Sequence, residues 1–413
     1  MVSYLTNAQE KIWSIQDCME YAIKNNITVQ QQNLLTQDAE LNIKDAKGAF
    51  LPNLGANASS TWFRNETSPD FRTTDYSVGT QIPIFNGFQN KNTLKTRNLE
   101  KKSNELTIGA TKDDIRINIA NAYLQILLEQ ESLALLQAQY KLTQEQIQLT
   151  KNLVEAGTTP KGDLLDLQAI GATDLQNIVN GENRVAIAFI NLKLLLNIEF
   201  DIDFDIQKMD VTLKETVLLD KPIKEIISKV LGNRNEVKLA EQNIEIAKQQ
   251  EKITKGAYLP TVSGFANLGE SETTSDGILL QANGFGTNYG LSVSLPIFNR
   301  FATKNAVSRT QVNTMRNEYQ LEQAKLQVTQ NVYQTYLDAK ASKKSYEAAQ
   351  VAVKAQELAF QYAQNRYEVG ISNSLDFSQA KLRLQNTQTQ LIQAKYSLLF
   401  QLKSLELYYV PTS

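Results

Sequence analysis

The sequence predicts a mainly helical protein with four β-strands, built as two copies of one unit. The decapeptide PIFNGFQNKN at 83–92 returns as PIFNRFATKN at 296–305, with seven of the ten positions identical. In both copies a run of alternating residues precedes the decapeptide, and a long run with helical periodicity follows it. Each copy therefore predicts strands that lead into a long helix.

The repeat extends well beyond these decapeptides. Further matched segments are KGAFLP at 47–52 with KGAYLP at 255–260, and EAG at 155–157 with EVG at 368–370. We assign residues 1–198 to the first repeat, 199–222 to an equatorial spacer and 223–413 to the second repeat. The offset between the copies is 208 to 213 residues, far longer than the period of a solenoid. We therefore interpret the copies as two halves of a single architecture.

A helix is predicted at the start of each repeat. In the first repeat, apolar residues from Ile15 onwards, including Leu34, Leu35 and Leu41, recur at spacings of three and four. The helix is expected to run to about Phe50, because proline follows at position 52.

Four strands of about ten residues each are predicted, two in each repeat. They are expected at 54–64, 74–84, 259–269 and 287–297. Along each strand, small and polar side chains alternate with apolar or small ones. The connecting segments 65–73 and 270–286 are polar and differ between the copies, so we expect them to be exposed loops.

Two interpretations of these strands remain open from the pattern alone. The length suits a tilted membrane-spanning strand. The same length equally suits a soluble β-hairpin with one solvent-exposed face. An open four-stranded sheet would expose its edges to lipid, which a membrane forbids. If the strands span a membrane, several chains must share one barrel, and three chains would supply twelve strands.

Each strand-to-helix junction has the same predicted construction. A proline is expected to end the strand because it has no N–H to donate, and asparagine suits the entry to the helix. The junction residues are Pro83, Phe85, Asn86, Pro296, Phe298 and Asn299.

Two long α-hairpins follow the junctions. Helices are predicted at 87–155 and 300–368, each ~100 Å long at ~1.5 Å per residue. Each carries an apolar stripe that it cannot bury alone, so it must pair along its length with the shorter helix that follows, at 163–197 or 375–407. Turns at the glycines 157 and 370 join the helices of each pair.

The spacer is predicted to contain a strand. Apolar residues from Phe200 to Ile206 alternate with Asp201, Asp203 and Asp205, which indicates a strand with an acidic outer face in a small collar around the helices. The glycine and the final glutamate of an EF-hand loop are missing, so we predict no metal site here.

Composition argues against several classes of function. The chain has no histidine, which excludes Ser-His-Asp and Cys-His catalysis and His-ligated metal sites. Its formal net charge of −2 provides no basic surface for a nucleic acid. The single cysteine, Cys18, is expected to be a buried small hydrophobe. With no phosphate loop and no pocket-like pair of acids, we predict neither an enzymatic activity nor a cofactor.

Membrane and export signals are absent from the sequence. No run of 18 apolar residues occurs, so no membrane-spanning helix is predicted. Residues 1–12 lack the charged start and apolar core of a secretory signal. For an exported protein, we expect the sequence to be a mature or trimmed form with an added first methionine.

This order of elements resembles the TolC-like outer-membrane efflux protein family. The resemblance rests on the two junctions, on the two Gly-Ala-aromatic-Leu-Pro strand entries and on the turn at 367–371, and it covers almost the whole chain. It implies a homotrimer in the Gram-negative outer membrane, in contact with lipid, whose twelve-stranded barrel continues as an α-helical tunnel across the periplasm. The implied partners are a periplasmic adaptor and an inner-membrane transporter, such as an RND pump or an ABC exporter.

The resemblance also implies roles for residues at the hairpin turns. The candidate gate residues are Asp163, Asp166, Tyr367 and Asp376. The candidate adaptor-docking residues are Gly157, Thr158, Val369, Gly370 and Ile371. A ring of acids in a narrow pore attracts cations and repels anions. Asp163 and Asp376 are equally consistent with plain helix N-caps, because each precedes an apolar helix start.

Three functions are carried forward from the sequence. The first is an outer-membrane duct that exports small molecules (drugs, toxic compounds or ions) as part of a tripartite efflux pump. The second is the duct of a type I protein secretion system. The third is a coiled-coil scaffold without a channel, which would not need four alternating strands.

Overall fold

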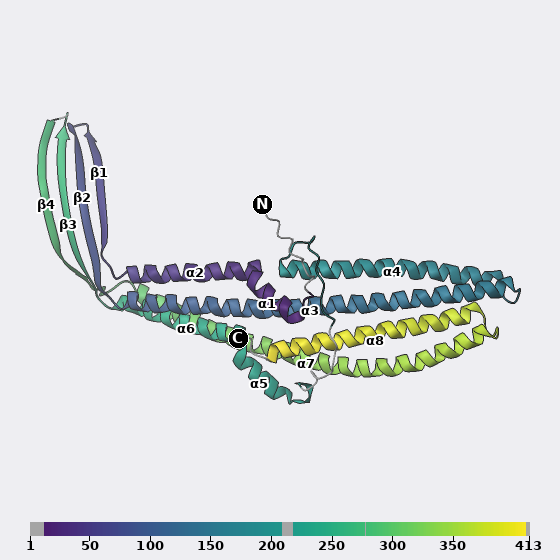
Figure 1. Cartoon of the computed structure of the whole chain (residues 1–413). Helices are drawn as coiled ribbons and strands as arrows, with labels where there is room; N and C mark the ends of the chain where they lie inside the picture. The colour runs from purple at the N-terminus through teal and green to yellow at the C-terminus, as the bar shows by residue number, and fades with distance from the viewer. Residues whose placement is uncertain (1–11, 209–217, 277, 410–413) are drawn as a thin grey trace, which may run out of the picture. The chain divides into compact units, whose positions relative to one another are not determined.

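The computed structural model describes residues 12–208, 218–276 and 278–409 (Figure 1). In chain order the elements are α1 Ile15–Asn25, α2 Ile27–Gly48, β1 Asn53–Asn65, β2 Ser68–Asn86, α3 Gln89–Glu155, α4 Lys161–Leu196, α5 Ile223–Asn233, α6 Asn235–Lys255, the 3-10 turn η2 Gly256–Tyr258, β3 Thr261–Ser275, β4 Ile278–Ser294, α7 Ala302–Glu368 and α8 Ser374–Tyr409. The predicted class, mainly helical with four strands, is confirmed.

The chain forms two compact units, and each unit contains parts of both repeats. The helical unit comprises Met1–Gln31, Ile108–Arg234 and Lys325–Ser413, and the sheet unit comprises Gln32–Thr107 and Asn235–Ala324. Both α3 and α7 contribute residues to both units. The repeats are therefore not separate globular domains, because the helices of one repeat find packing partners in the other.

The sheet unit contains one antiparallel sheet in the order β1-β2-β3-β4. Its register places Thr80 opposite Ala266, and Ala266 opposite Tyr289, so the predicted apolar residues share one face. Asn57, Ser77 and their neighbours occupy the other face. Within the described residues β1 and β4 are the edge strands, and each has a single strand neighbour.

The strands are longer than predicted. The segments 65–73 and 270–286, expected to be exposed loops, are largely strand: Thr73 pairs with Thr273, and Glu272 pairs with Ala282. The prediction was wrong because polar composition was taken to indicate a loop. β-branched threonines favour extended backbone, and a ladder is held by main-chain hydrogen bonds that do not depend on side-chain polarity.

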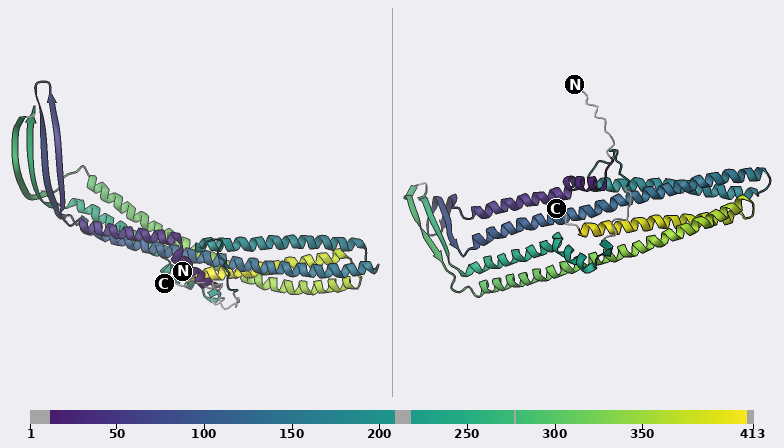
Figure 2. Two further views of the ribbon diagram at one scale, coloured as in Figure 1. Left: turned by 45° about the horizontal axis from the view of Figure 1, so that its top comes forward. Right: turned by 60° about the horizontal axis from the view of Figure 1, so that its bottom comes forward.

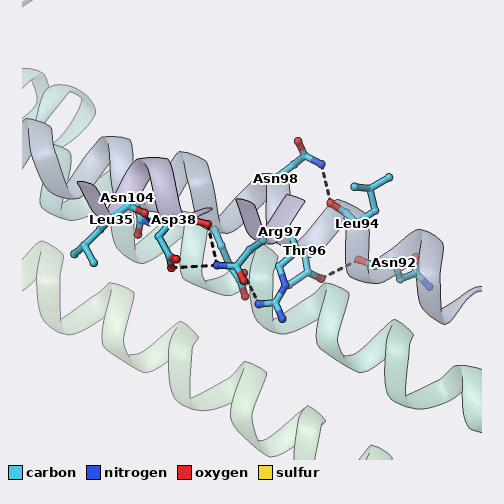
Figure 3. Close-up of polar contacts among 10 residues, drawn as sticks. Leu35, Asp38, Asn92, Leu94, Thr96, Arg97, Asn98 and Asn104 are labelled. Atoms are coloured by element: carbon cyan, nitrogen blue, oxygen red, sulfur yellow. Dashed lines mark hydrogen bonds and ion pairs between the residues drawn. The ribbon is translucent and has the colours of Figure 1, made fainter. Parts of the chain in front are cut away.

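Polar contacts hold α2 against α3 in the sheet unit (Figure 3). The side-chain amide of Asn104 donates to the carbonyl of Leu35 over 3.2 Å. Nearby, Lys101 of α3 forms an ion pair with Glu40 of α2 at 2.7 Å. Leu34, Leu35 and Leu41 are all more than half exposed. Within a single chain, the predicted apolar stripe of α2 is therefore mostly not buried against other apolar residues.

The predicted helix at 15–50 is broken into α1 and α2 at Asn26. Asn26 has extended backbone, its side-chain oxygen accepts from the backbone N–H of Thr28 at 2.9 Å, and its amide donates to the carbonyl of Leu195 at 3.4 Å. Periodicity did not reveal this break, because asparagine can both end one helix and cap the next.

The spacer does not form the predicted strand. In its described part the only strand-like pairing is an isolated parallel β-bridge between Ile206 and Trp13. Beside it, the phenol of Tyr123 donates to the carbonyl of Gln207 at 2.5 Å. The alternation of apolar and acidic residues did not predict the structure correctly, because Phe204 and Ile206 pack on the helical core instead of on a sheet. Among the described residues, no group of three or more acidic or cysteine side chains has an arrangement that would hold a metal.

Two long hairpins, α3 with α4 and α7 with α8, dominate the helical unit (Figures 1 and 2). Its largest apolar cluster contains Tyr123, Leu192 and Tyr396, together with Cys18, which is fully buried as predicted. Burial and the neighbouring Asp17 raise the pKa of the Cys18 thiol to about 12. In the part of the chain that the structure describes, no helix is both long enough and apolar enough to cross a membrane.

Candidate gate at the hairpin turns and the strand-to-helix junctions

The two junctions share one backbone design. Residues 87 and 88 in the first copy, and Arg300 and Phe301 in the second, all have left-handed backbone with φ between 55° and 65°. In each copy two phenylalanines meet edge to face: Phe85 with Phe88 at 5.1 Å and Phe298 with Phe301 at 5.7 Å. The side chains of Asn86 and Asn299 hydrogen-bond the residue four positions later, Asn90 and Thr303.

The role predicted for Pro83 is wrong. Pro83 lies inside β2, opposite Ser263, and the register shifts between Pro83 and Phe85. A β-bulge tolerates a residue without an N–H, so the strand continues past the proline to Asn86. Pro296 does follow the end of β4 at Ser294.

Glycine is required at position 87 but not at its counterpart, Arg300. A Cβ built on Gly87 would lie 2.2 Å from the backbone oxygen of Gly256, so these two backbones are in close contact. Arg300 adopts similar backbone with a full side chain. The two junctions therefore have different surroundings although their local design is the same.

The two hairpin turns are closed by the same pattern of hydrogen bonds. Gly157 and Gly370 both have φ +75°, and each donates its N–H to the carbonyl three residues earlier at 3.0 Å. The next residue, Thr158 or Ile371, donates to the carbonyl five residues earlier at 3.0 or 2.8 Å. This is the Schellman motif, which ends a helix with a left-handed residue. Val369 and Ile371 are exposed on the second turn.

Tyr367 is buried just before the second turn. Its hydroxyl lies 2.9 Å from the hydroxyl of Thr150 on α3, and its ring stacks on Phe377 of α8 with centroids 5.2 Å apart. Burial raises the pKa of Tyr367, the hydrogen bond to Thr150 opposes this rise, and the Asp163 carboxylate adds to it. The phenol therefore joins the two hairpins in its protonated form.

The structure brings only one of the three candidate acids into a contact between the hairpins. Asp163 is half-buried and accepts a hydrogen bond from the hydroxyl of Ser374 on α8 at 2.9 Å. Asp166 and Asp376 are exposed, and the side chain of neither has a hydrogen-bond partner within the described residues.

Neither Asp163 nor Asp376 is an N-cap. The N-cap of α4 is Pro160, and the start of α8 is capped by the side chain of Asn373, which accepts from the backbone N–H of Asp376 at 2.9 Å. Both acids lie in the first turn of their helices, where they interact favourably with the helix dipole. The capping prediction failed because the helices begin before each acid, at Lys161 and Ser374.

A buried ion pair farther from the turns was missed from the sequence. Asp174 on α4 and Lys381 on α8 are 2.7 Å apart, with side chains only 8% and 7% exposed. The hydroxyl of Thr143 on α3 donates to Asp174 at 2.5 Å and also accepts from Lys381. A signal existed in the sequence: Asp174 falls in line with the buried Leu167, Gly171 and Ile178, so a charge occupies an apolar position of α4.

Comparison with known proteins identifies the class of protein that this fold and these turns belong to. Residues 19–197 and 226–408, which correspond to the two repeats, match the family model described as outer membrane efflux protein. The chain belongs to this family, as the resemblance predicted. It is an outer-membrane protein that extends into the periplasm.

Relatives include efflux and secretion proteins. The chain is 24% identical to outer membrane protein TolC of Escherichia coli, over 86% of this chain and 74% of that protein. It is 25% identical to the toluene efflux pump outer membrane protein TtgC of Pseudomonas putida, over 92% of this chain and 79% of TtgC. It is 21% identical to the alkaline protease secretion protein AprF of Pseudomonas aeruginosa, over 69% and 59% respectively.

Solved structures share the fold at low sequence identity. CusC superposes with a TM-score of 0.81 at 17% identity, covering 96% of this chain and 92% of CusC. VceC of Vibrio cholerae superposes with a TM-score of 0.76 at 17% identity, covering 95% of each chain. The predicted fold class is therefore supported over the length of the chain.

Proposed function

We propose that this protein is the outer-membrane exit duct of a tripartite efflux pump and exports small molecules without chemistry of its own. The observation that carries the proposal is the family match over both repeats, in a chain whose sheet has an apolar face and, among the described residues, one unpaired edge on each of β1 and β4. A coiled-coil scaffold gives no reason for such a sheet. None of the relatives named above is an enzyme by name.

Three copies of the chain form the duct in this proposal. Unpaired strand edges are unfavourable in lipid, and β4 of one copy can pair with β1 of the next. Three copies bring together twelve strands and close the sheet into a barrel, with the apolar face towards lipid. The hairpins of three copies then form the helical tunnel in the periplasm.

The gate of the duct lies at the hairpin turns in this proposal. Tyr367 and Asp163 contact Thr150 and Ser374 across the two hairpins, so they hold the hairpins together near their ends. The exposed carboxylates of Asp166 and Asp376 are free to line the pore and select against anions.

The exposed turns dock on a periplasmic adaptor, which connects the duct to an inner-membrane transporter of the RND or ABC class. Their exposed apolar side chains, Val369 and Ile371, support this role. We expect deletion of 155–163 to spare the trimer and abolish transport, measured as loss of resistance to an exported drug. Transport that survives the deletion would refute docking through this turn.

Single-channel recording in a planar bilayer tests the duct directly. We expect purified, detergent-extracted protein to give discrete current steps. Protein that is shown to be inserted but gives no steps would overturn the proposal.

A duct for secreted proteins is the second candidate, because two relatives, AprF and PrtF, carry secretion in their names. Expression in a host that lacks its own duct, beside either a drug pump or a protease exporter, separates the two candidates. Restored drug resistance supports efflux, and protease in the medium supports secretion.

A further inference from the structure

The two long hairpins correspond residue by residue. α3 and α7 each have 67 residues, and α4 and α8 each have 36, so one offset of 213 relates the first hairpin to the second without a gap. Packing follows the same correspondence. Arg184 and Glu129 form an ion pair at 3.0 Å within the first hairpin, and their counterparts Ser397 and Ser342 form a hydrogen bond at 3.1 Å within the second.

Within one chain, the first hairpin contacts the second through polar pairs along their length. Glu131 on α3 forms an ion pair with Lys395 on α8 at 2.7 Å and accepts from the hydroxyl of Tyr396 at 2.9 Å. Further pairs are Asp174 with Lys381, Asp163 with Ser374, and Thr150 with Tyr367.

In a ring of three chains, the second hairpin of one copy must meet the first hairpin of the next. We call this contact between neighbouring copies the seam. Because the two hairpins correspond residue by residue, the seam places the counterparts of these pairs opposite each other. The counterpart of Glu131 is Lys344, and the counterpart of Lys395 is Glu182. The ion pair is therefore retained at the seam with its charges exchanged.

The remaining contacts also map onto compatible residues. Asp163 with Ser374 becomes Asp376 with Lys161, which is a second pair of opposite charge. The buried Asp174 with Lys381 becomes Thr387 with Gln168, an uncharged polar pair. Thr150 with Tyr367 becomes Ala363 with Val154, an apolar pair. No contact maps onto two like charges.

Helix geometry places these counterparts on the free side of α4. Lys161, Gln168 and Glu182 are separated by multiples of seven, so they share one face of α4. Asp163 and Asp174 lie about a quarter to a half of a turn away from that face, and they contact the second hairpin of their own chain. Glu182 and Lys344 are exposed and have no ion-pair or hydrogen-bond partner within the described residues.

We propose that Glu182 of one copy and Lys344 of the next form an ion pair that orders the hairpins around the ring. This inference rests on the proposed trimer. Two first hairpins side by side would oppose Glu131 with Glu182, and two second hairpins would oppose Lys344 with Lys395. The charges therefore favour a ring in which first and second hairpins alternate. Only this order lets identical chains close a ring through the seam.

Charge reversal tests the seam. In detergent at low salt, we expect Glu182→Lys and Lys344→Glu each to lower the trimer association constant about fivefold or more, measured by native mass spectrometry across a dilution series. The double variant restores opposite charges and should return the constant to the wild-type range. About 1 M salt should weaken the effect of the single variants.

A matched control is Lys224→Glu, which makes the same charge change at an exposed position of α5, outside the two hairpins, and should leave the trimer unchanged. A wild-type protein that is not trimeric would overturn the proposed duct itself. A trimeric wild type that is unaffected by Glu182→Lys, or a double variant that fails to recover, would overturn the seam alone.

Discussion

The hydroxyl groups of Tyr367 and Thr150 lie 2.9 Å apart, although 217 residues separate them in the chain. Both side chains are buried, with exposures of 4% and 0%. A hydrogen bond between buried groups is costly to break unless both partners reach water or new partners. This contact therefore favours the arrangement in which the ends of the two hairpins stay together.

Removing the contacts between the hairpin ends should open the gate. In Tyr367→Phe combined with Asp163→Ala, the hydrogen bonds to Thr150 and Ser374 at the hairpin ends are lost, at ~1 kcal/mol each. We expect larger or more frequent single-channel openings than in the wild type. Tyr362→Phe is the matched control, because Tyr362 lies on the same helix and is 72% exposed. Identical recordings from the double variant and the wild type would argue against these gate residues.

Breaking the buried ion pair should destabilise the helical unit. Lys381→Met leaves Asp174 buried without its cation, which we expect to cost about 3–5 kcal/mol in the free energy of unfolding, measured with denaturant in detergent. The double change Asp174→Leu with Lys381→Met should cost much less. As a control, Lys248→Met removes the exposed pair with Glu245 and should cost less than about 1 kcal/mol. Equal losses from Lys381→Met and Lys248→Met would contradict this account.

The first junction should be far less tolerant of substitution than the second. In Gly87→Ala, the new Cβ would lie 2.2 Å from the backbone oxygen of Gly256, and the left-handed backbone adds strain. We expect a loss of about 2–5 kcal/mol in the free energy of unfolding. Arg300→Ala changes the corresponding position of the second repeat, where a side chain is already present, and should cost little. If both variants unfold at the same denaturant concentration, the close contact at Gly87 is not required.

Alkaline pH should destabilise the helical core through Cys18. Its folded pKa of about 12 is above the usual thiol value, so the folded state keeps a proton that the unfolded state releases. The contribution of this thiol is intact below about pH 8.5 and is lost as the pH rises towards 12. Cys18→Ala should therefore show a shallower fall in melting temperature between about pH 8.5 and 11. The fall should not vanish, because burial also raises the pKa of Tyr123 and Tyr396.

The sequence by itself determined the features that depend on local pattern and on internal repetition. The repeated PIFN segment, the alternation of four runs and the long stretches without proline define the duplicated order of strands and helices. The glycines at 157 and 370 mark the turns, because a left-handed residue ends a helix most easily when it has no Cβ.

Only the tertiary structure decided which residues meet across the two repeats. Thr150 with Tyr367 and Asp174 with Lys381 are pairs separated by more than 200 residues, and no local periodicity encodes their meeting. The same limit explains the errors at Asn26, at Pro83 and in the strand ends. Whether a residue ends an element there depends on hydrogen bonds to a distant partner strand or helix, because the local sequence allows both outcomes.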